Sequence, residues 1–383
     1  MARYLRRIKI LCKSIRFSLG SVPRSDLVIM YSEPLLTGLF PRSFVYEPFI
    51  IYVQFEFIRF FTHFLLKGFG FRLALMSTVV MTTKAKSVIT FMDNCSVVLK
   101  LADRFADRCN CFILQNGVRT PRYFQTLAGT QGLSLGHYFS MGSWQQSVID
   151  ELGITYESIT VAGSLRNYLV ARRGIDLSFI QHDRDKTSIG YLSQSNGLDS
   201  EVFWLSNARI LEMISALKCS YPEMSVEVFG RYFQRRLVDT ELKFLEKYAN
   251  FEYKFNESQN DLDPLSLFAR VSKSNASVII THSSNAGFEL ASLGVRVLFV
   301  EPLGPEYQLL GFMEGSPLYI NSSSQNLFRE KVRWLASLDH RSWSKIHTEF
   351  AAKFCKANHI HGVEFTELFD RVGLIGGEHI FYE

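Results

Sequence analysis

One stretch of the chain, residues 277–302, constrains the fold most, because it predicts a complete strand, turn, helix and strand. It reads SVIITHSSNAGFELASLGVRVLFVEP. The β-branched run at 278–280 is typical of a parallel strand buried on both faces. Small polar residues follow and can cap a helix that ends at Gly294. The apolar run at 295–300 then supplies the next buried strand, so the segment predicts an α/β crossover.

The turn of this crossover predicts a site for a nucleotide phosphate. Free backbone N–H groups and the positive end of the helix dipole lie there beyond the strand's carboxyl end, where open α/β sheets bind ligands. Glu289, about one turn into the helix, could bind the paired hydroxyls of a ribose. The alternative is an ordinary capped crossover with Glu289 in solvent. The candidate donor-binding residues here are His282, Ser283, Ser284, Asn285 and Glu289.

The segment resembles the donor-site element of GT-B glycosyltransferases, in which a Ser-rich turn holds the diphosphate and a glutamate follows on the helix. Three earlier runs, FILQNGVR, GHYFSMGSWQQSVIDELGI and TVAGSLRNYLV, are similar to bacterial surface-carbohydrate biosynthesis proteins. That GT-B group is related to polyol-phosphate transferases of the CDP-glycerol type and to capsule Kdo transferases. The resemblance implies two facing Rossmann-like domains with an interdomain cleft and a nucleotide-sugar donor.

One departure from the CDP-glycerol group affects the expected chemistry. That group usually carries a histidine before the glycine of the QNG-like run, and this chain has Asn116 there. An amide cannot act as a base. Asn116 therefore argues against transfer of a polyol phosphate and favours transfer of a sugar.

The order of predicted elements indicates an α/β fold with two doubly wound parallel sheets. The 383 residues, of which 47% are hydrophobic and 21% charged, suffice for two domains with separate cores. Strand-like runs alternate with helical stretches in both halves. We expect an acceptor-side domain at 1–171, a linker at 172–186, a nucleotide-sugar domain at 187–341, and helices at 342–383 that pack back toward the first domain.

Polar residues follow several predicted strands of the first half and would converge at one sheet edge. Asp93 and Glu33 have the chemistry of a general base, which needs hydrogen-bond reach to an acceptor hydroxyl. Asp93 is the preferred base. The alternative for the loop at 115–119 is a plain strand-end turn with a surface arginine. The candidate acceptor or phosphate contacts are Gln115, Asn116, Gly117, Arg119, Ser164 and Arg166.

The donor side gains three further candidates from the second half. Ser193 and Gln194 follow one predicted strand, and Arg231 follows the next. By topology these residues lie at the same edge as the Ser-rich turn. Arg231 is a candidate phosphate clamp.

Charge and cysteine content exclude several classes of protein. The net charge of +5 is too small to indicate nucleic-acid binding. Six scattered cysteines form no metal-binding pattern and favour a reduced, cytoplasmic protein. Two Asp-x-Asp patterns, 183–185 and 261–263, match the metal motif of GT-A transferases, but one lies in the predicted linker and the other would cap a helix. We therefore expect neither a metal nor a cofactor.

The first 20 residues alternate basic and apolar side chains near helical spacing. They predict an interfacial helix on an anionic membrane surface, with a helix packed on its own domain as the alternative. The Phe-rich stretch 40–71 is either a buried helix pair or an exposed aromatic surface beside a lipid-linked acceptor. The expected location is the inner face of the cytoplasmic membrane, as a peripheral protein.

The sequence thus predicts a metal-independent glycosyltransferase that acts on a bacterial surface polysaccharide or lipid-linked acceptor. In this scheme Asp93 deprotonates the acceptor hydroxyl, and Ser283, Ser284 and the helix N-terminus stabilise the departing phosphate. The capsule resemblance implies a CMP-linked ulosonic acid such as Kdo as donor. A polyol-phosphate transferase, a GT-B-fold sugar-nucleotide epimerase and a non-catalytic glycan-binding scaffold stay open as alternatives.

Overall fold

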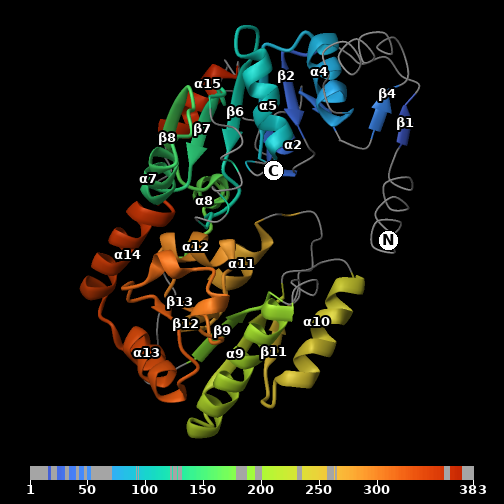
Figure 1. Ribbon diagram of the computed structural model, residues 1–383. Coiled ribbons are helices and arrows are strands. Elements are labelled where there is room, and N and C mark those ends of the chain that lie inside the picture. Colours follow the sequence, from blue (N-terminus) through green and yellow to red (C-terminus); the bar gives the residue numbers. More distant parts are fainter. Residues whose placement is uncertain are drawn as a thin grey trace.

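The computed structural model of the protein shows two parallel α/β sheets, each covered by helices (Figure 1). We call each sheet with its helices a domain, N-terminal and C-terminal. The residues that the structure describes are 16–18, 24–30, 34–39, 43–46, 50–52, 71–91, 93, 95–120, 123, 127, 132–177, 188–194, 201–230, 235–256, 263, 265–357 and 363–372.

The N-terminal sheet has the strand order β3-β2-β5-β6-β7-β8, and all its pairs are parallel. Chain order changes direction between β2 and β5, which makes this pair the topological switch point. Its strands are β2 (Leu27–Met30), β3 (Phe44–Tyr46), β5 (Ser87–Thr90), β6 (Asn110–Leu114), β7 (His137–Ser140) and β8 (Ser158–Val161). Its helices are α2 (Pro34–Leu39), α4 (Phe71–Thr83), α5 (Ser96–Phe105), α7 (Ser143–Glu151) and α8 (Leu165–Arg172).

The C-terminal sheet has the order β11-β10-β9-β12-β13-β14, again all parallel. This is the order of a dinucleotide-binding Rossmann fold, with the switch point between β9 and β12. Its strands are β9 (Ser188–Leu192), β10 (Ser225–Phe229), β11 (Lys254–Asn256), β12 (Val278–Thr281), β13 (Val297–Val300) and β14 (Tyr319–Ile320). Its helices are α9 (Glu201–Ser220), α10 (Arg235–Tyr248), α11 (Ser266–Ser272), α12 (Asn285–Ser292) and α13 (Gln325–Ser337), and short 3-10 turns lie at Pro305–Tyr307 and Gly311–Met313.

The central strands form where the sequence has short β-branched and aromatic runs, because both faces of each sheet are buried there, whereas the edge strands β8 and β11 are partly exposed. Every residue of β9, β12 and β13 is buried, as a doubly covered parallel sheet requires. Gly190 in β9 leaves room for the side chains of Ile279 and Phe229, which a Cβ at this position would meet within 3 Å. The predicted α/β class with two parallel sheets is confirmed.

Two C-terminal helices return the chain to the N-terminal domain. Helix α14 (His340–Phe354) runs along one side of the molecule and reaches α7, and α15 (Val363–Arg371) follows it (Figure 1). The backbone N–H of Lys356 donates to Met141 O at 2.7 Å, and the Phe365 ring packs on Tyr168. Helix α14 therefore joins the two domains through side chains and backbone.

Several expectations fall on residues outside the described ranges. These are residues 1–15 and 19–20 of the basic N-terminal segment, most of the Phe-rich stretch, the linker from 178 onward, the Asp-x-Asp pattern at 183–185, and the candidates Glu33 and Arg231. Where the structure describes parts of the two predicted helical segments, namely residues 16–18 of the basic segment and 44–46 and 50–52 of the Phe-rich stretch, it has strands and not helices. Strands β1 (Arg16–Ser18) and β4 (Ile50–Tyr52) form a separate parallel pair. The predicted domain boundaries and the roles of these residues stay predictions.

Candidate functional site

The candidate donor site lies at the switch point of the C-terminal sheet, where the loops after β9 and β12 meet. Gln194, which follows β9, accepts a hydrogen bond from the backbone N–H of Ser283 at 2.8 Å through Oε1. The same oxygen accepts from the Thr281 hydroxyl at 3.4 Å. One amide side chain therefore ties together the two loops between which open α/β sheets bind ligands. Neighbouring Ser193 is fully buried, and its hydroxyl has no partner among the described residues.

His282 is buried beside this edge as a neutral imidazole. Burial lowers its pKa to about 4, and Phe203 packs edge-on against the ring. Nδ1 lies 3.0 Å from the Ser283 hydroxyl, and Nε2 lies 3.9 Å from Oε1 of Glu301 at the end of β13. His282 and Ser283 therefore form one polar pair, which orients the serine hydroxyl at the turn.

Glu301 is a buried acid that the sequence analysis missed. It accepts from the backbone N–H groups of Leu309 and Leu310 and from the Tyr319 hydroxyl at 2.6 Å. Burial raises its pKa despite these bonds. The only sequence signal was a glutamate directly after a buried strand.

Helix α12 begins at the same edge, and its first residues face the N-terminal domain. Ser284 is the N-cap, but its side chain makes no capping bond, so this hydroxyl is not needed to start the helix. Asn285 lies against Gly117 of the loop after β6. A Cβ on Gly117 would lie 2.2 Å from Nδ2 of Asn285, and Gly117 has φ +153°. The glycine is therefore required both by its backbone angle and by this close approach.

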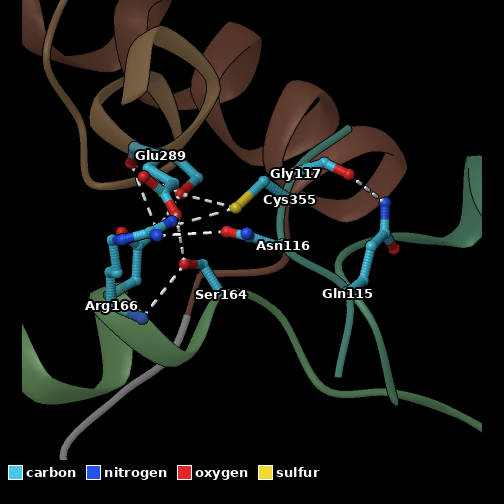
Figure 2. Close-up of polar contacts among 9 residues, drawn as sticks. Gln115, Asn116, Gly117, Ser164, Arg166, Glu289 and Cys355 are labelled. Atoms are coloured by element: carbon cyan, nitrogen blue, oxygen red, sulfur yellow. Dashed lines mark hydrogen bonds and ion pairs between the residues drawn. The ribbon is translucent and has the colours of Figure 1, made fainter. Parts of the chain in front are cut away.

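Glu289 does not extend into solvent: it is bonded to the N-terminal domain (Figure 2). Its Oε1 accepts from the Ser164 hydroxyl at 2.6 Å and from Nη1 of Arg166 at 3.2 Å. The Glu289 side chain is 2% exposed and that of Arg166 is 20% exposed. Both partners come from the first turn of α8, where Ser164 is also the N-cap. The expected solvated alternative for Glu289 is thus not what the structure shows.

Arg166 is held from two further directions. Its Nη2 donates to Oδ1 of Asn116 at 3.0 Å (Figure 2). Its guanidinium also lies 5.1 Å from the centre of the Phe91 ring, in a cation–π arrangement. Gln115 fixes the same loop by donating to Gly117 O at 2.6 Å and accepting from the backbone N–H of Met141 at 2.7 Å. The QNG loop and the GSLR segment therefore form one polar surface against α12.

Three residues beneath this contact were not expected as site residues. Asn167 is fully buried and donates through Nδ2 to the backbone O of Glu289 and to the Ser292 hydroxyl. The same amide lies 3.6 Å from Sγ of Cys355, which follows α14. Burial, followed by the charge of Glu289, raises the pKa of Cys355 to about 12, so the thiol is protonated and unreactive. Asn167 directly follows the GSLR motif, which is the only sequence signal for this group.

Asp93, the preferred base, forms a buried ion pair with Arg119. Arg119 donates to Oδ2 through Nε at 2.9 Å and to Oδ1 through Nη2. The Tyr138 hydroxyl lies 3.4 Å from the carboxylate, which is itself 0% exposed. Burial opposes the charge on Arg119, but the bond to Asp93 outweighs it and raises the pKa of Arg119. Both carboxylate oxygens are engaged, so the geometry favours a structural role, and catalysis by Asp93 stays a prediction.

The described residues contain no group of three or more His, Cys, Asp or Glu side chains that could hold a metal ion. Asp263 of the second Asp-x-Asp pattern pairs with Arg173 and accepts from the Leu265 backbone N–H. The helix that follows, α11, begins at Ser266 with Leu265 as its N-cap, so the prediction that Asp263 caps it is wrong. No described helix combines the length and apolar character that crossing a bilayer requires.

The comparisons with known proteins give the fold. No family model and no curated protein matches the sequence. A protein of Listeria monocytogenes described as a UDP-N-acetylglucosamine 2-epimerase has a TM-score of 0.52, with 11% identity over 94% of this chain and 100% of that chain. The wall teichoic acid polymerase TagF, in a variant soaked with CDPG, has a TM-score of 0.51, with 13% identity over 93% and 91%. The S. aureus MnaA–UDP complex also has a TM-score of 0.51, with 13% identity over 93% and 99%.

These likenesses span nearly the whole of both chains, and they show a GT-B-like architecture. At 11–13% identity they carry no information on the reaction. The fold is therefore GT-B-like, with two Rossmann-like domains.

Proposed function

We propose that this protein is a glycosyltransferase that transfers a sugar from a nucleotide-sugar donor to a bacterial surface glycan or lipid-linked acceptor. The observation that carries the proposal is the convergence at the β9/β12 switch point. There Gln194, Ser283 and the start of α12 form a polar edge opposite the QNG loop of the other domain. Backbone N–H groups and the dipole at the start of α12 suit a diphosphate.

In this proposal the donor and acceptor lie on opposite sides of the domain junction. The α12 turn stabilises charge on the leaving nucleotide phosphate without a metal, as preorganised N–H donors do. The QNG loop and α8 belong to the acceptor side. The acceptor base is not assigned to Asp93, because Arg119 occupies both of its oxygens. A CMP-linked ulosonic acid is one donor to test among several.

The donor site is tested by a thermal-shift panel of UDP, GDP, CDP and CMP on the full chain. A nucleotide that binds only the native state raises the unfolding free energy by about 2.7 kcal/mol at 100 times its Kd. We expect one nucleotide to stabilise the protein and Ser284→Ala to weaken that binding by about 1 to 3 kcal/mol, the scale of a bond to a charged group.

The matched control is Ser324→Ala at the N-cap of α13. The Ser324 hydroxyl does cap its helix, by accepting from the Leu327 backbone N–H at 3.3 Å. Its loss should cost about 1 kcal/mol of stability and leave nucleotide affinity unchanged. Absence of binding by all four nucleotides would reject the proposed function.

A sugar-nucleotide epimerase is the second candidate, because Arg119 engages both oxygens of Asp93, which disfavours the preferred acceptor base. An epimerase needs no acceptor. Once a nucleotide is known, the matching nucleotide sugars are incubated with the protein with and without a lipid-linked acceptor. Conversion that requires the acceptor supports the transferase, and conversion without it supports the epimerase.

The proposed location is the cytoplasmic membrane surface, through the basic N-terminal segment 1–20. Each basic residue near an anionic leaflet contributes about 1 kcal/mol. The full chain should sediment with anionic vesicles in low salt, and a chain lacking residues 1–17 should not. If the full chain shows no salt-dependent vesicle binding, the membrane part of the proposal fails.

A further inference from the structure

The Glu289 carboxylate is asymmetrically occupied. Both of its hydrogen bonds, from the Ser164 hydroxyl and from Arg166, end on Oε1. No partner of Oε2 lies among the residues that the structure describes. An oxygen of a carboxylate has two lone pairs in its plane, so two donors fill Oε1.

The two donors are rigidly placed in the N-terminal domain. Ser164 is the N-cap of α8 and also accepts from the Arg166 backbone N–H at 3.1 Å. Arg166 is oriented by Asn116 and by the Phe91 ring. The contact is also sterically tight, since Gly117 lies directly against Asn285. Glu289 and Asn285 both belong to α12, so the same helix that would hold the nucleotide is fastened to the opposite domain.

A ribose diol presents two adjacent O–H donors and would bind one to each oxygen of a carboxylate. Oε2 can take one hydroxyl, but Oε1 is already filled. We propose that Glu289 is a latch between the domains, and that a bound ribonucleotide takes Oε1 from Ser164 and Arg166 and so releases the junction. This inference rests on the proposed nucleotide site, because it names Glu289 as the carboxylate that the ribose reaches.

The latch reverses the expected effect on nucleotide affinity of removing Arg166. A residue that contacts the donor phosphate weakens nucleotide binding when it is removed. A residue that competes with the nucleotide for Glu289 strengthens binding when it is removed, because the competent state becomes more populated. Removing Arg166 also leaves the buried Glu289 charge with fewer partners, which favours a ligand that supplies new donors.

The experiment measures the affinity of UDP and CDP for the full-length protein and its variants by titration calorimetry. We expect Arg166→Met and Ser164→Ala to bind the nucleotide about fivefold or more tightly, at the lower end of typical coupling between sites. Ser164→Ala removes a single oxygen and guards against a folding defect in Arg166→Met. Glu289→Gln should bind more weakly than the native chain.

Two controls make the result specific. Arg173→Met breaks another contact between the domains, the exposed pair with Asp263, and should leave affinity unchanged. The 2′,3′-dideoxy form of the same nucleotide cannot use Glu289, so Arg166→Met should not tighten its binding.

Equal or weaker binding by both variants, with binding intact in the native chain, overturns the latch and leaves the proposed function standing. Equal tightening of the dideoxy nucleotide also overturns it, since opening rather than competition at Glu289 would then be the cause. No binding of UDP or CDP by the native chain or any variant overturns the latch. If GDP and CMP also fail to stabilise the native chain, the proposed function falls with it.

Discussion

The part of the chain that the structure describes contains two buried carboxylate–arginine pairs that are chemically alike but differently placed. Asp93 and Arg119 have side chains that are 0% and 17% exposed, and Glu289 and Arg166 have values of 2% and 20%. The first pair lies wholly within the N-terminal domain. The second joins α12 of one domain to α8 of the other. Similar exposure therefore accompanies two different kinds of contact.

The surroundings of the pairs explain the difference. Asp93 is bound bidentately and lies beside the hydroxyl of Tyr138, and the hydroxyl of Tyr123 donates to its backbone O. Burial, followed by the charge of Asp93, raises the pKa of both tyrosines, so they stay neutral donors. Glu289 has one oxygen engaged and lies at a junction between domains. A closed network is suited to stability, whereas a half-engaged carboxylate at a junction can exchange partners.

Among the predicted effects on the unfolding free energy, that of Asp93→Asn is the largest. Removing one member of a buried ion pair leaves an uncompensated charge, which costs about 3 to 5 kcal/mol. We expect a loss of about 3 kcal/mol in the unfolding free energy, measured with urea at neutral pH. Asp26→Asn, which breaks an exposed pair with Lys86 at 3.3 Å, is the matched control and should change little.

The same variant tests the catalytic interpretation of Asp93. Stability close to the native value, together with a hundredfold loss of transfer, would restore Asp93 as the base. Loss of stability that is repaired by also replacing Arg119 with methionine would show that the pair acts as a structural unit.

A second prediction concerns pH and the donor edge. His282 has a pKa lowered from 6.5 to about 4 by burial, so the unfolded chain binds a proton that the folded chain refuses between these values. Stability therefore rises with pH across this window and falls as the pH drops from 6.5 toward 4, by up to about 3 kcal/mol.

Urea unfolding at pH 7.5, 6 and 5 measures this dependence. His282→Gln removes the titrating group and should flatten the slope relative to the native chain. An unchanged slope in the variant would mean that other groups cause the pH dependence and that the pKa of His282 is the same in the folded and unfolded chain.

The sheets were predictable because their signals are local. The runs at 87–90, 137–140 and 278–281 are short, apolar and bounded by polar turns, and each forms a strand at or within one residue of the expected position. The turn after β12 and the start of α12 at Asn285 follow from local sequence in the same way. These features depend on residues that are close in the chain.

The partners of the charged residues were not predictable, because they depend on how the two domains meet. Glu289 and Ser164 are 125 residues apart, and no periodic pattern connects them. Asp93 was selected as a base because a carboxylate after a strand suits catalysis, but the same position also suits a buried pair with Arg119. The exposure of the carboxylate and the presence of a paired arginine decide between these two roles. Neither can be read directly from the sequence.

A third prediction examines the close approach of the domains. Gly117→Ala places a Cβ against Asn285 and puts an alanine at a backbone φ of +153°. We expect the unfolding free energy to fall by about 2 kcal/mol, the scale of overpacking and backbone strain. Adding Asn285→Ala removes the clash and should recover part of the loss. Gly174→Ala is the control, since Gly174 has φ +64° with open space around it.

The stability that the double variant recovers separates the cost of steric contact from the cost of backbone strain. Full recovery in the double variant would assign the cost to the domain contact alone. No recovery would mean that Asn285 does not press on Gly117 in solution, and it would weaken the view of the two domains as directly packed at this point.

The smallest expected effect comes from a third carboxylate–arginine pair, Arg173 with Asp263, which also joins the two domains but lies in solvent. The bond is 2.8 Å long, and the side chains are 53% and 27% exposed. Exposed pairs contribute at most about 1 kcal/mol, and salt screens them. Arg173→Met should therefore lower the unfolding free energy by about 0.5 kcal/mol in low salt, and the difference should vanish near 1 M NaCl. A loss as large as that of Asp93→Asn would show that bridging the domains, rather than burial, determines what such a pair contributes.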